Sequence, residues 1–390
     1  MKNVLEYLEN VKTNNLVIDK NGSISYQKLL ENSKKIGSGL GKFVKNNDPV
    51  PVYMEKGISA LEVFMGALYS GGFYSLLNVG LPKMRLEQII NVLDVDYIVT
   101  DIEHLEDAKV FFPDKELILY EDLIKEEIND DLLNEIRKKK IDLDPVYANF
   151  TSGSTGVPKG VIVGNRSIID FVDNFVDTFG IKDDDVIANQ APFDFDVSVK
   201  DIYPALKTGA TLVIVPKELF SKPALLIDFL VDHKVTTMTW AVSALCLIST
   251  FHGLDYKVPT SVKRVMFSGE VMPMKHLKSW MEHLPNAMFV NLYGPTEITC
   301  NCTYHIIDRN REYEKMPVGI PFNNEAVFLL NDKNELVTKE SEKGEICVRG
   351  TALALGYYKN NEQTDKAFVR NPLNDKYIEY IYRTGDLSLI

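Results

Sequence analysis

The sequence predicts an α/β protein with largely parallel sheets and a β-rich unit at its C-terminal end. The first observation behind this prediction is that short apolar runs bounded by glycine, proline or aspartate alternate with longer amphipathic stretches. This alternation is typical of strands joined by helical crossovers. The second observation is that glycines divide the region after residue 300 into short alternating segments, such as 326–330 and 345–348. Segments of this kind are typical of antiparallel strands.

The expected elements follow one another along the chain from strand to helix. Apolar runs with turn residues on both sides predict the strands 97–100, 117–119, 186–188, 211–215 and 262–267. Amphipathic stretches predict the helices 84–93, 167–179, 224–233 and 274–283. We expect the charge-dense segment 121–140 to be a solvated helix rather than a docking patch. Residues 37–42 match neither the dinucleotide nor the Walker spacing, so a helix with small residues is expected there.

Length and composition exclude several classes of function. A chain of 390 residues with 45% hydrophobic residues can build real cores. The net charge of -12 opposes binding to nucleic acid, which requires a basic surface. The uncharged run 63–82 contains several glycines and a proline, so we expect no membrane span. Residues 1–6 lack the apolar part of a secretory signal and the four cysteines are scattered, which favours a cytoplasmic setting.

A phosphate-binding loop is the most informative feature of the sequence. The residues Thr-Ser-Gly-Ser-Thr-Gly-Val-Pro-Lys-Gly occupy positions 151–160, directly after the apolar run 146–150. Glycines let backbone N–H groups turn toward an anion, hydroxyls add donors, and Lys159 supplies a mobile positive charge. The loop is not a Walker A motif, because Lys159 is followed by Gly160 instead of serine or threonine. A phosphate group is therefore the expected ligand.

This loop resembles, at every fixed position, the signature of the adenylate-forming (AMP-binding) superfamily. That superfamily contains acyl-CoA synthetases, luciferases and the adenylation domains of nonribosomal peptide synthetases, and the last group is the one this chain resembles most. Further segments are similar to the family's motifs and follow in the family's order, namely 291–297, 344–350, 353–358 and 382–387. The resemblance thus covers nearly the whole chain.

The resemblance implies one adenylation domain core over residues 1–390. Its expected fold is the large N-terminal core of an adenylate-forming enzyme, with two interleaved α/β sheets over 1–300 and a small distorted β-barrel within the β-rich part 301–390. After Asp386 only four residues follow, so the small C-terminal subdomain of the family is expected to be absent. That subdomain carries a lysine which bridges the substrate carboxylate and the α-phosphate, so slow adenylation is expected from residues 1–390 alone.

The resemblance also implies ATP and Mg²⁺ as cofactors and a role for each motif residue. In the family Tyr293 would flank adenine, Thr296 would reach a phosphate, Glu297 would coordinate Mg²⁺, and Asp386 would accept hydrogen bonds from the ribose hydroxyls. An aromatic face suits a purine, and a carboxylate suits a hard cation. The implied catalytic residues are Thr151, Lys159, Thr296 and Glu297. The implied ATP-binding residues are Thr151, Ser152, Gly153, Ser154, Thr155, Gly156, Lys159, Gly269, Glu270, Asn291, Leu292, Tyr293, Gly294, Thr296 and Asp386.

The segment Phe-Asp-Val-Ser at 195–198 is similar to that of family members that use amino acids. There the aspartate, Asp196 here, pairs with the substrate α-ammonium, and a buried charge requires such a partner. Asp196 could also cap the helix that follows, and the two interpretations are compatible. The amino-acid-binding residues that the resemblance implies are Asp196, Val197, Lys200, Thr239, Met266, Ser268, Leu292, Cys300 and Asn301.

Serine is the expected substrate, because Asp196, Val197, Ser268 and Leu292 agree with the combination usual in serine-activating domains. Lys200 departs from that combination and leaves two alternatives open. It could form an ion pair with Asp196 four residues earlier on a helix, or it could accept an acidic substrate side chain. We favour serine over an acidic amino acid. The segments 198–204 and 269–273 also resemble D-alanine:carrier-protein ligases, which are the alternative enzyme.

The reaction implied by the resemblance is attack of an amino-acid carboxylate on the α-phosphorus of ATP, with pyrophosphate leaving. The acyl group would then pass to the phosphopantetheine thiol of a partner carrier domain, among neighbouring synthetase modules. An acyl-CoA synthetase is disfavoured because a fatty acid offers no ammonium to Asp196. A nucleotide-binding module without chemistry is the remaining alternative. A metal–thiolate site at Cys300, Cys302 and His305 is disfavoured, because it offers only three ligands.

Overall fold

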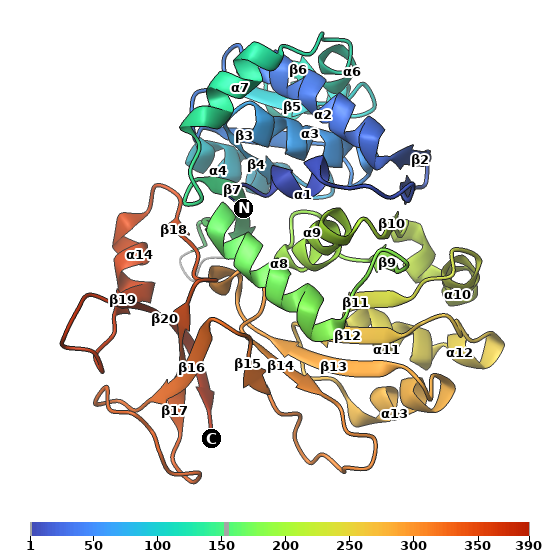
Figure 1. Cartoon of the computed structure of the whole chain (residues 1–390), viewed down its shortest axis with the longest axis vertical. Helices are drawn as coiled ribbons and strands as arrows, with labels where there is room; N and C mark the ends of the chain where they lie inside the picture. Colours follow the sequence, from blue (N-terminus) through green and yellow to red (C-terminus); the bar gives the residue numbers. More distant parts are fainter. Residues whose placement is uncertain (1, 152–155, 390) are drawn as a thin grey trace.

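The computed structural model describes residues 2–151 and 156–389, and the chain is organised around three sheets (Figure 1). The first is a seven-stranded sheet in the order β18-β8-β7-β4-β3-β5-β6. Its strands are β3 (Pro49–Tyr53), β4 (Phe73–Leu76), β5 (Tyr97–Thr100), β6 (Glu116–Leu119), β7 (Pro145–Thr151), β8 (Lys159–Gly164) and β18 (Gly356–Tyr357). Strands β3 to β7 are parallel, whereas β8 and β18 are antiparallel additions at one edge.

Helices from the N-terminal part of the chain lie beside this sheet (Figure 1). They are α2 (Tyr26–Leu40), α3 (Ile58–Tyr69), α4 (Lys83–Leu93), α5 (Leu105–Phe111), α6 (Tyr120–Leu123) and α7 (Asp130–Lys139). Helices α2 and α3 approach closely, because a Cβ on Gly37 would lie 2.4 Å from Cβ of Tyr69. Likewise, a Cβ on Gly66 would lie 2.3 Å from a methyl of Ile36. The prediction of a helix with small residues at 37–42 is thus confirmed for residues 37–40, where α2 ends.

The second sheet has nine strands in the order β15-β14-β13-β12-β11-β9-β10-β1-β2. Its strands are β1 (Leu16–Asp19), β2 (Gly22–Ser25), β9 (Val186–Asn189), β10 (Thr211–Ile214), β11 (Thr237–Ala241), β12 (Arg264–Ser268), β13 (Met288–Tyr293), β14 (Thr303–Ile306) and β15 (Ile320–Pro321). The accompanying helices are α1 (Leu5–Glu9), α8 (Asn165–Phe179), η1 (Asp196–Ser198), α9 (Val199–Thr208), η2 (Lys217–Ser221), α10 (Pro223–Asp232), α11 (Val242–Thr250), α12 (Gly253–Tyr256), α13 (Met274–His283) and η3 (Thr296–Ile298).

The third sheet is antiparallel and has four strands in the order β16-β17-β20-β19. Its strands are β16 (Glu325–Leu330), β17 (Gly344–Gly350), β19 (Phe368–Arg370) and β20 (Tyr380–Ser388), and α14 (Asn361–Ala367) precedes β19. This sheet begins later than the sequence division at residue 300 suggested. Strands β14 and β15 extend the nine-stranded sheet instead, because β14 pairs with β13.

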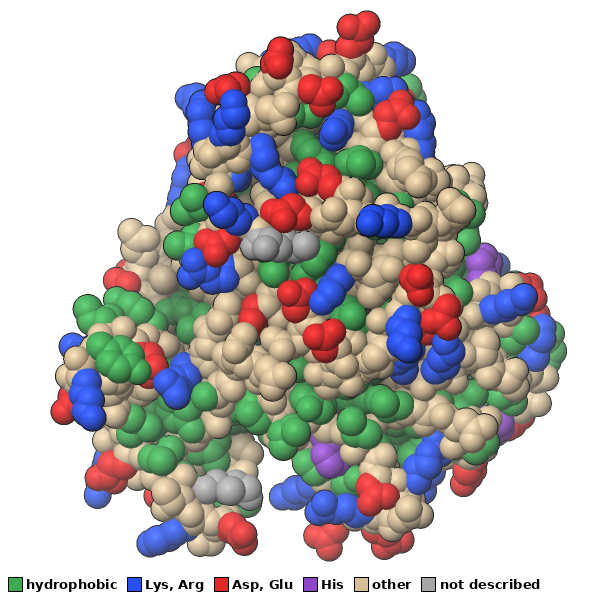
Figure 2. All heavy atoms as spheres, viewed as in Figure 1, with side chains coloured by type: hydrophobic (Ala, Val, Ile, Leu, Met, Phe, Trp, Pro, Cys, Tyr) green, Lys and Arg blue, Asp and Glu red, His purple; other side chains and the backbone are tan. Residues whose placement is uncertain are grey.

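Most of the elements predicted from periodicity are confirmed to within one or two residues. Helix α13 has the predicted bounds of 274 and 283, and β5 those of 97 and 100. The charged segment 121–140 differs, because it forms the short α6 and the separate α7 instead of one helix. Figure 2 shows acidic and basic side chains mixed over the viewed face, without a broad basic patch. Among the described residues, no helix combines the length and apolar character needed to cross a membrane.

Two large hydrophobic cores support the sheets. The main core joins helices on both larger sheets and includes the fully buried Phe64 and Phe175. A second core surrounds Trp240 and Trp280, beside the parallel part of the nine-stranded sheet. Both indole N–H groups are satisfied, because they donate to the carbonyls of Ala188 at 2.8 Å and of Leu245 at 3.0 Å. These cores hold the strand ends from which the site residues project.

Candidate active site

The residues predicted for the site gather where parallel strands end. Strand β12 is parallel to β11 and β13 and ends at Ser268, while β13 ends at Tyr293. Asp196 follows the neighbouring parallel strand β9 in the same sheet. In open α/β sheets, ligands bind in the crevice outside such carboxyl ends. The topology thus brings together side chains that are far apart in the sequence.

Thr151 and Lys159 flank the predicted phosphate loop as direct partners in the antiparallel pair β7 and β8. The carbonyl of Thr151 accepts a hydrogen bond from the guanidinium of Arg85 at 3.1 Å, which anchors the start of the loop. Gly156 has a φ of 80°, a left-handed conformation that favours glycine. The predicted ligands Ser152, Gly153, Ser154 and Thr155 lie outside the described residues.

The side chain of Tyr357 contacts both Lys159, the predicted phosphate residue, and Glu297, the predicted magnesium residue. The ammonium of Lys159 lies 5.2 Å from the centre of the Tyr357 ring. The hydroxyl of Tyr357 donates to Oε1 of Glu297 over 2.7 Å. Burial and this carboxylate raise the pKa of Tyr357. Tyr357 belongs to the motif 353–358, for which the sequence predicts no role of an individual side chain.

Tyr293 and Asp386, the predicted adenine and ribose residues, are in direct contact. The hydroxyl of Tyr293 donates to Oδ2 of Asp386 over 2.6 Å. Burial and this hydrogen bond raise the pKa of Tyr293. The contact brings β20 of the four-stranded sheet to the end of β13.

The turn after β13 is shaped by close packing. A Cβ on Gly294 would lie 2.5 Å from the Cα of Asn301, so this position has room only for glycine. Thr296 and Glu297 follow in the short helix η3. Asn291 has a structural role, because its amide donates to the carbonyl of Pro317 at 2.8 Å. These contacts place Thr296 and Glu297 at the edge of the crevice.

The remaining nucleotide predictions differ in their exposure. Leu292 is buried in the main core, with only 2% of its surface exposed. Gly269 and Glu270 follow β12 directly and are exposed. Gly269 has a φ of 92°, a left-handed conformation in which a side chain would be strained. These residues therefore border the crevice at the end of β12.

Asp196 is half-buried in η1, at the carboxyl-end edge of the nine-stranded sheet. Burial raises its pKa, which a hydrogen bond from Thr296 and the charge of Lys200 partly oppose. Its predicted role as a helix cap is wrong. Helix α9 begins at Val199, and the residue before it, Ser198, makes no side-chain capping bond. A desolvated carboxylate without a capping role is suited to a cationic ligand.

Lys200, one of the predicted amino-acid-binding residues, is buried, with 1% of its surface exposed. Its ammonium donates to Oδ1 of Asn301 at 2.6 Å and to Oγ of Ser268 at 3.1 Å. Within the described chain, no carboxylate oxygen lies within 4.0 Å of it, so the alternative of an ion pair with Asp196 is wrong. The side chain extends to β12 and to residue 301 instead of along its own helix. Burial lowers the pKa of Lys200.

The other predicted pocket residues surround this lysine with a mixture of polar and apolar groups. Met266 and Thr239 are buried on the adjacent strands β12 and β11, and Val197 is half-buried beside Asp196. The buried hydroxyl of Thr239 has no hydrogen-bond partner in the part of the chain that the structure describes. The thiol of Cys300 donates to the carbonyl of Asp196 at 3.0 Å.

Tyr147 is a further candidate that sequence reasoning missed. This residue of β7 is 1% exposed, and its hydroxyl has no hydrogen-bond partner among residues 2–151 and 156–389. Burial raises its pKa, and the nearby Cys300 and Asp196 contribute to the rise. The only signal in the sequence is a tyrosine in the apolar run before the phosphate loop. Buried hydroxyls are rarely left unpaired, so Tyr147 and Thr239 are candidate contacts for a polar ligand.

The residues present fit a magnesium ion that arrives with a nucleotide. Glu297 would supply one carboxylate to the ion, and Thr296 would supply a hydroxyl to the phosphates that complete its coordination. Magnesium is usually held by one or two carboxylates together with substrate phosphates rather than by a complete protein cage. Residues 2–151 and 156–389 contain no group of three or more histidine, cysteine, aspartate or glutamate side chains arranged to hold a metal. The thiol of Cys300 is directed to a backbone carbonyl.

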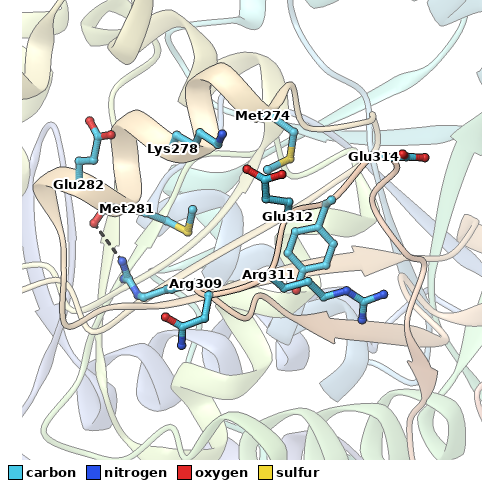
Figure 3. A pocket seen from close by; sticks show the side chains of 10 residues that line it. Met274, Lys278, Met281, Glu282, Arg309, Arg311, Glu312 and Glu314 are labelled. Carbon is cyan, nitrogen blue, oxygen red and sulfur yellow. Dashed lines mark hydrogen bonds between the residues drawn. The ribbon is translucent and has the colours of Figure 1, made fainter.

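A separate hollow of about 630 Å³ lies between α13 and residues 309–314 (Figure 3). It is lined by Met274, Met281 and several charged residues, including Lys278 and Glu312. None of the residues predicted for the site lines it. The convergence of the motifs, rather than the size of a hollow, therefore locates the candidate active site.

Comparison with known proteins agrees with this geometry. A sequence model of the family described as AMP-binding enzyme matches residues 8–358. The D-alanine--D-alanyl carrier protein ligase of Staphylococcus haemolyticus is 30% identical over 377 residues, covering 95% of this chain and 71% of the ligase. Tyrocidine synthase 3 of Brevibacillus parabrevis is 31% identical over 326 residues, covering 83% of this chain but 5% of that synthase.

Solved structures show the same fold. The nonribosomal peptide synthetase FmoA3, in a form bound to α-methyl-L-serine-AMP, matches with a TM-score of 0.90 and 23% identity, covering 100% of this chain and 43% of that one. The N-terminal subdomain of Klebsiella oxytoca NpsA matches with a TM-score of 0.82 and 19% identity, covering 100% of this chain and 97% of the subdomain. This chain therefore spans less than half of the FmoA3 chain. On the match of residues 8–358 and the identity to a carrier-protein ligase over most of its length, this chain belongs to the AMP-binding enzyme family.

Proposed function

We propose that this protein uses ATP to activate an amino acid as an aminoacyl-adenylate, releasing pyrophosphate, and loads it onto the phosphopantetheine thiol of a carrier domain. The observation that carries the proposal is the placement of Asp196 beside Thr296 and Glu297. The hydroxyl of Thr296 and the charge of Glu297 both act on the pKa of Asp196. An ammonium-binding carboxylate thus adjoins the residues expected to hold the phosphates and Mg²⁺.

In the proposed reaction, an oxygen of the amino-acid carboxylate bonds to the α-phosphorus while the bond from that phosphorus to pyrophosphate breaks. Asp196 holds the α-ammonium and so orients the carboxylate. Lys159 and Thr296 bind phosphate oxygens, Tyr293 contacts adenine, and Asp386 binds the ribose. Magnesium held by Glu297 would neutralise phosphate charge. No covalent bond to the protein is needed, because positioning and charge neutralisation promote the step.

Serine is the substrate that we propose first. Asp196, Val197, Ser268 and Leu292 agree with the combination usual in serine-activating domains, which supports a small polar side chain. Ser268 lies at the end of β12, where its hydroxyl accepts a hydrogen bond from Lys200 over 3.1 Å. D-alanine, the substrate named for the carrier-protein ligases with 30% identity, is a small neutral alternative.

An acidic amino acid is the second candidate, and the surroundings of Lys200 favour it. A buried ammonium without a carboxylate partner is costly, and its two acceptors, Asn301 and Ser268, are neutral. An ammonium has three donors, so one remains for a ligand. The carboxylate of a substrate side chain would supply the missing charge.

Pyrophosphate exchange with the full-length protein tests these proposals. The panel should contain L-serine, L-cysteine, L-threonine, L-alanine, D-alanine, L-aspartate and L-glutamate. Highest kcat/KM with serine would support the first candidate, and preferential turnover of aspartate or glutamate would replace it with the second. Exchange driven by fatty acids would point to an acyl-CoA synthetase. Absence of exchange with every acid, while ATP still binds, would leave a nucleotide-binding module.

The proposed setting and partners follow from the same chemistry. We place the protein in the cytoplasm, where ATP and Mg²⁺ are available and cysteines remain reduced, because its four cysteines form no disulfide in the described structure. A carrier domain is the proposed partner, with neighbouring modules if the protein is part of a synthetase. Residues 1–390 would then form one adenylation core.

A further inference from the structure

Tyr357 lies between two opposite charges of the candidate active site. Its hydroxyl donates to Oε1 of Glu297 over 2.7 Å. The ammonium of Lys159 lies over its ring in a cation–π contact, 5.2 Å from the ring centre. Within the described residues, the ammonium of Lys159 has no carboxylate oxygen within 4.0 Å. Lys159 and Glu297 therefore share one neighbour without forming an ion pair with each other.

The position of Tyr357 is set by several independent contacts. Its strand β18 pairs with β8, so that Tyr357 lies opposite Val161, two residues beyond Lys159. Its backbone N–H donates to the hydroxyl of Thr364 at 3.0 Å. Its ring packs edge-on against Phe368, with the centroids 6.0 Å apart. The side chain is 7% exposed and is thus held in place before any ligand binds.

We infer that Tyr357 is a positioning residue that keeps Lys159 and Glu297 apart and leaves each of them available to a magnesium nucleotide. The inference rests on the proposed function only in its choice of nucleotide. A direct ion pair would neutralise both groups, and ligand binding would first have to break it. A cation–π contact and one hydrogen bond are weaker, so both groups can turn to phosphate and metal at small cost.

The hydrogen bond also gives the two oxygens of the Glu297 carboxylate different surroundings. Tyr357 engages Oε1 of Glu297, so we expect a cation to be bound mainly through the other oxygen, Oε2. The hydroxyl of Tyr357 is the donor in this bond, so it adds no negative charge beside the proposed magnesium ligand.

Two variants of the full-length protein separate the two contacts of Tyr357. Tyr357→Phe keeps the ring beside Lys159 but removes the hydroxyl, and Tyr357→Leu removes both. The measurement is calorimetric binding of a non-hydrolysable ATP analogue, with and without Mg²⁺. We expect Tyr357→Phe to bind the metal-free analogue like the wild type but to lose about three- to tenfold of the tightening that Mg²⁺ provides. Tyr357→Leu should bind more weakly in both conditions.

Tyr358→Phe is the matched control, because Tyr358 is the next residue but packs against Phe73 and carries Lys359 on its ring. It should leave both affinities unchanged. Equal Mg²⁺ dependence in Tyr357→Phe and the wild type would overturn the inference. If Tyr357→Leu fails to fold, Tyr357→Phe still decides, because it keeps the ring packing. Failure of the proposed function would appear separately, as a wild-type protein that binds the analogue but exchanges no pyrophosphate.

Discussion

The hydroxyl of Tyr293 donates to the carboxylate of Asp386 over 2.6 Å, joining the end of β13 to β20. The two residues are 93 positions apart in the sequence and belong to different sheets. A ring and a carboxylate held in this way present an aromatic face and a hydrogen-bond acceptor side by side. These are the two groups that we propose contact the adenine and the ribose of ATP.

Removal of this hydroxyl should weaken nucleotide binding without affecting amino-acid binding. Tyr293→Phe keeps the ring but frees Asp386, so we expect the KM for ATP to rise about three- to tenfold while the KM for the amino acid stays constant. Steady-state pyrophosphate exchange measures both constants. Tyr304→Phe, in the neighbouring strand β14, is the control and should change neither. An equal rise in both constants would indicate a general loss of structure.

Asp196→Asn should abolish activity without loss of stability. The carboxylate is the proposed partner of the substrate ammonium, and removal of such a contact costs about 10²–10³ in kcat/KM. Because burial raises the pKa of Asp196, its ionised form destabilises the fold at neutral pH, and the neutral amide should keep or raise Tm. Exchange assays and thermal melts test the two statements. Asp194→Asn, whose carboxylate binds Asn78, is the control and should retain activity.

Lys200→Met should shift substrate preference toward neutral amino acids. If the ammonium pairs with an acidic substrate, its loss should lower kcat/KM for aspartate or glutamate by at least about 30-fold relative to serine. The buried charge is replaced by a side chain of similar volume, so the protein should remain folded. Lys207→Met, on the same helix but in a surface pair with Asp173, is the control. An unchanged ratio of acidic to neutral turnover would remove the acidic candidate.

Asp201 should make stability depend on pH. The residue is 0% exposed, its Oδ1 has no hydrogen-bond partner among the described residues, and burial raises its pKa from 3.8 to about 8. The folded state therefore holds this proton at pH values where the unfolded state has lost it. Stability from this group should be lost as the pH rises from about 4 to about 8. Asp201→Asn should remove that contribution, so that its Tm falls less than that of the wild type between pH 5 and pH 8; parallel curves would contradict the assignment.

Gly294→Ala should damage both stability and activity. The added methyl would lie 2.5 Å from the Cα of Asn301 and 2.8 Å from the backbone nitrogen of Cys302, so the backbone must move. Overpacking of this kind typically costs about 1–3 kcal/mol. The control is Gly80→Ala, because the nearest contact of the added methyl would be a side-chain oxygen of Asn78 at 3.3 Å, and a side chain can shift by a few tenths of an ångström. Denaturant unfolding and exchange assays should show a lower free energy of unfolding and weaker activity for Gly294→Ala alone.

Periodicity and local chemistry were sufficient for most of the elements. The spacing of apolar residues predicted α13 and β5 with the bounds that the structure has, because both depend on which face of a short segment is buried. The break between α6 and α7 within segment 121–140 could not be predicted, because charged residues run through the whole segment and mark no boundary. The limit of the β-rich unit could not be predicted either, because pairing between β13 and β14 is a tertiary event.

The candidate site likewise has features that the sequence predicted and features that it could not predict. Motif order located Lys159, Glu297, Tyr293 and Asp386, because each of these segments has a distinctive composition. The environment of Lys200 could not be predicted from its helix. Local spacing suggested Asp196 as a partner, whereas the observed acceptors, Ser268 and Asn301, lie 68 and 101 residues away. The bridging position of Tyr357 likewise depends on the pairing of β18 with β8.

The sequence by itself determined the class of fold, the order of the motifs and the types of side chain available for the chemistry. It did so because periodicity and turn residues act over a few positions, where neighbours in the chain are neighbours in space. Only the tertiary structure decided which groups touch. Lys200 faces neutral acceptors, and Tyr357 stands between Lys159 and Glu297, because sheet pairing over long sequence separations sets the distances on which hydrogen bonds and charge interactions depend.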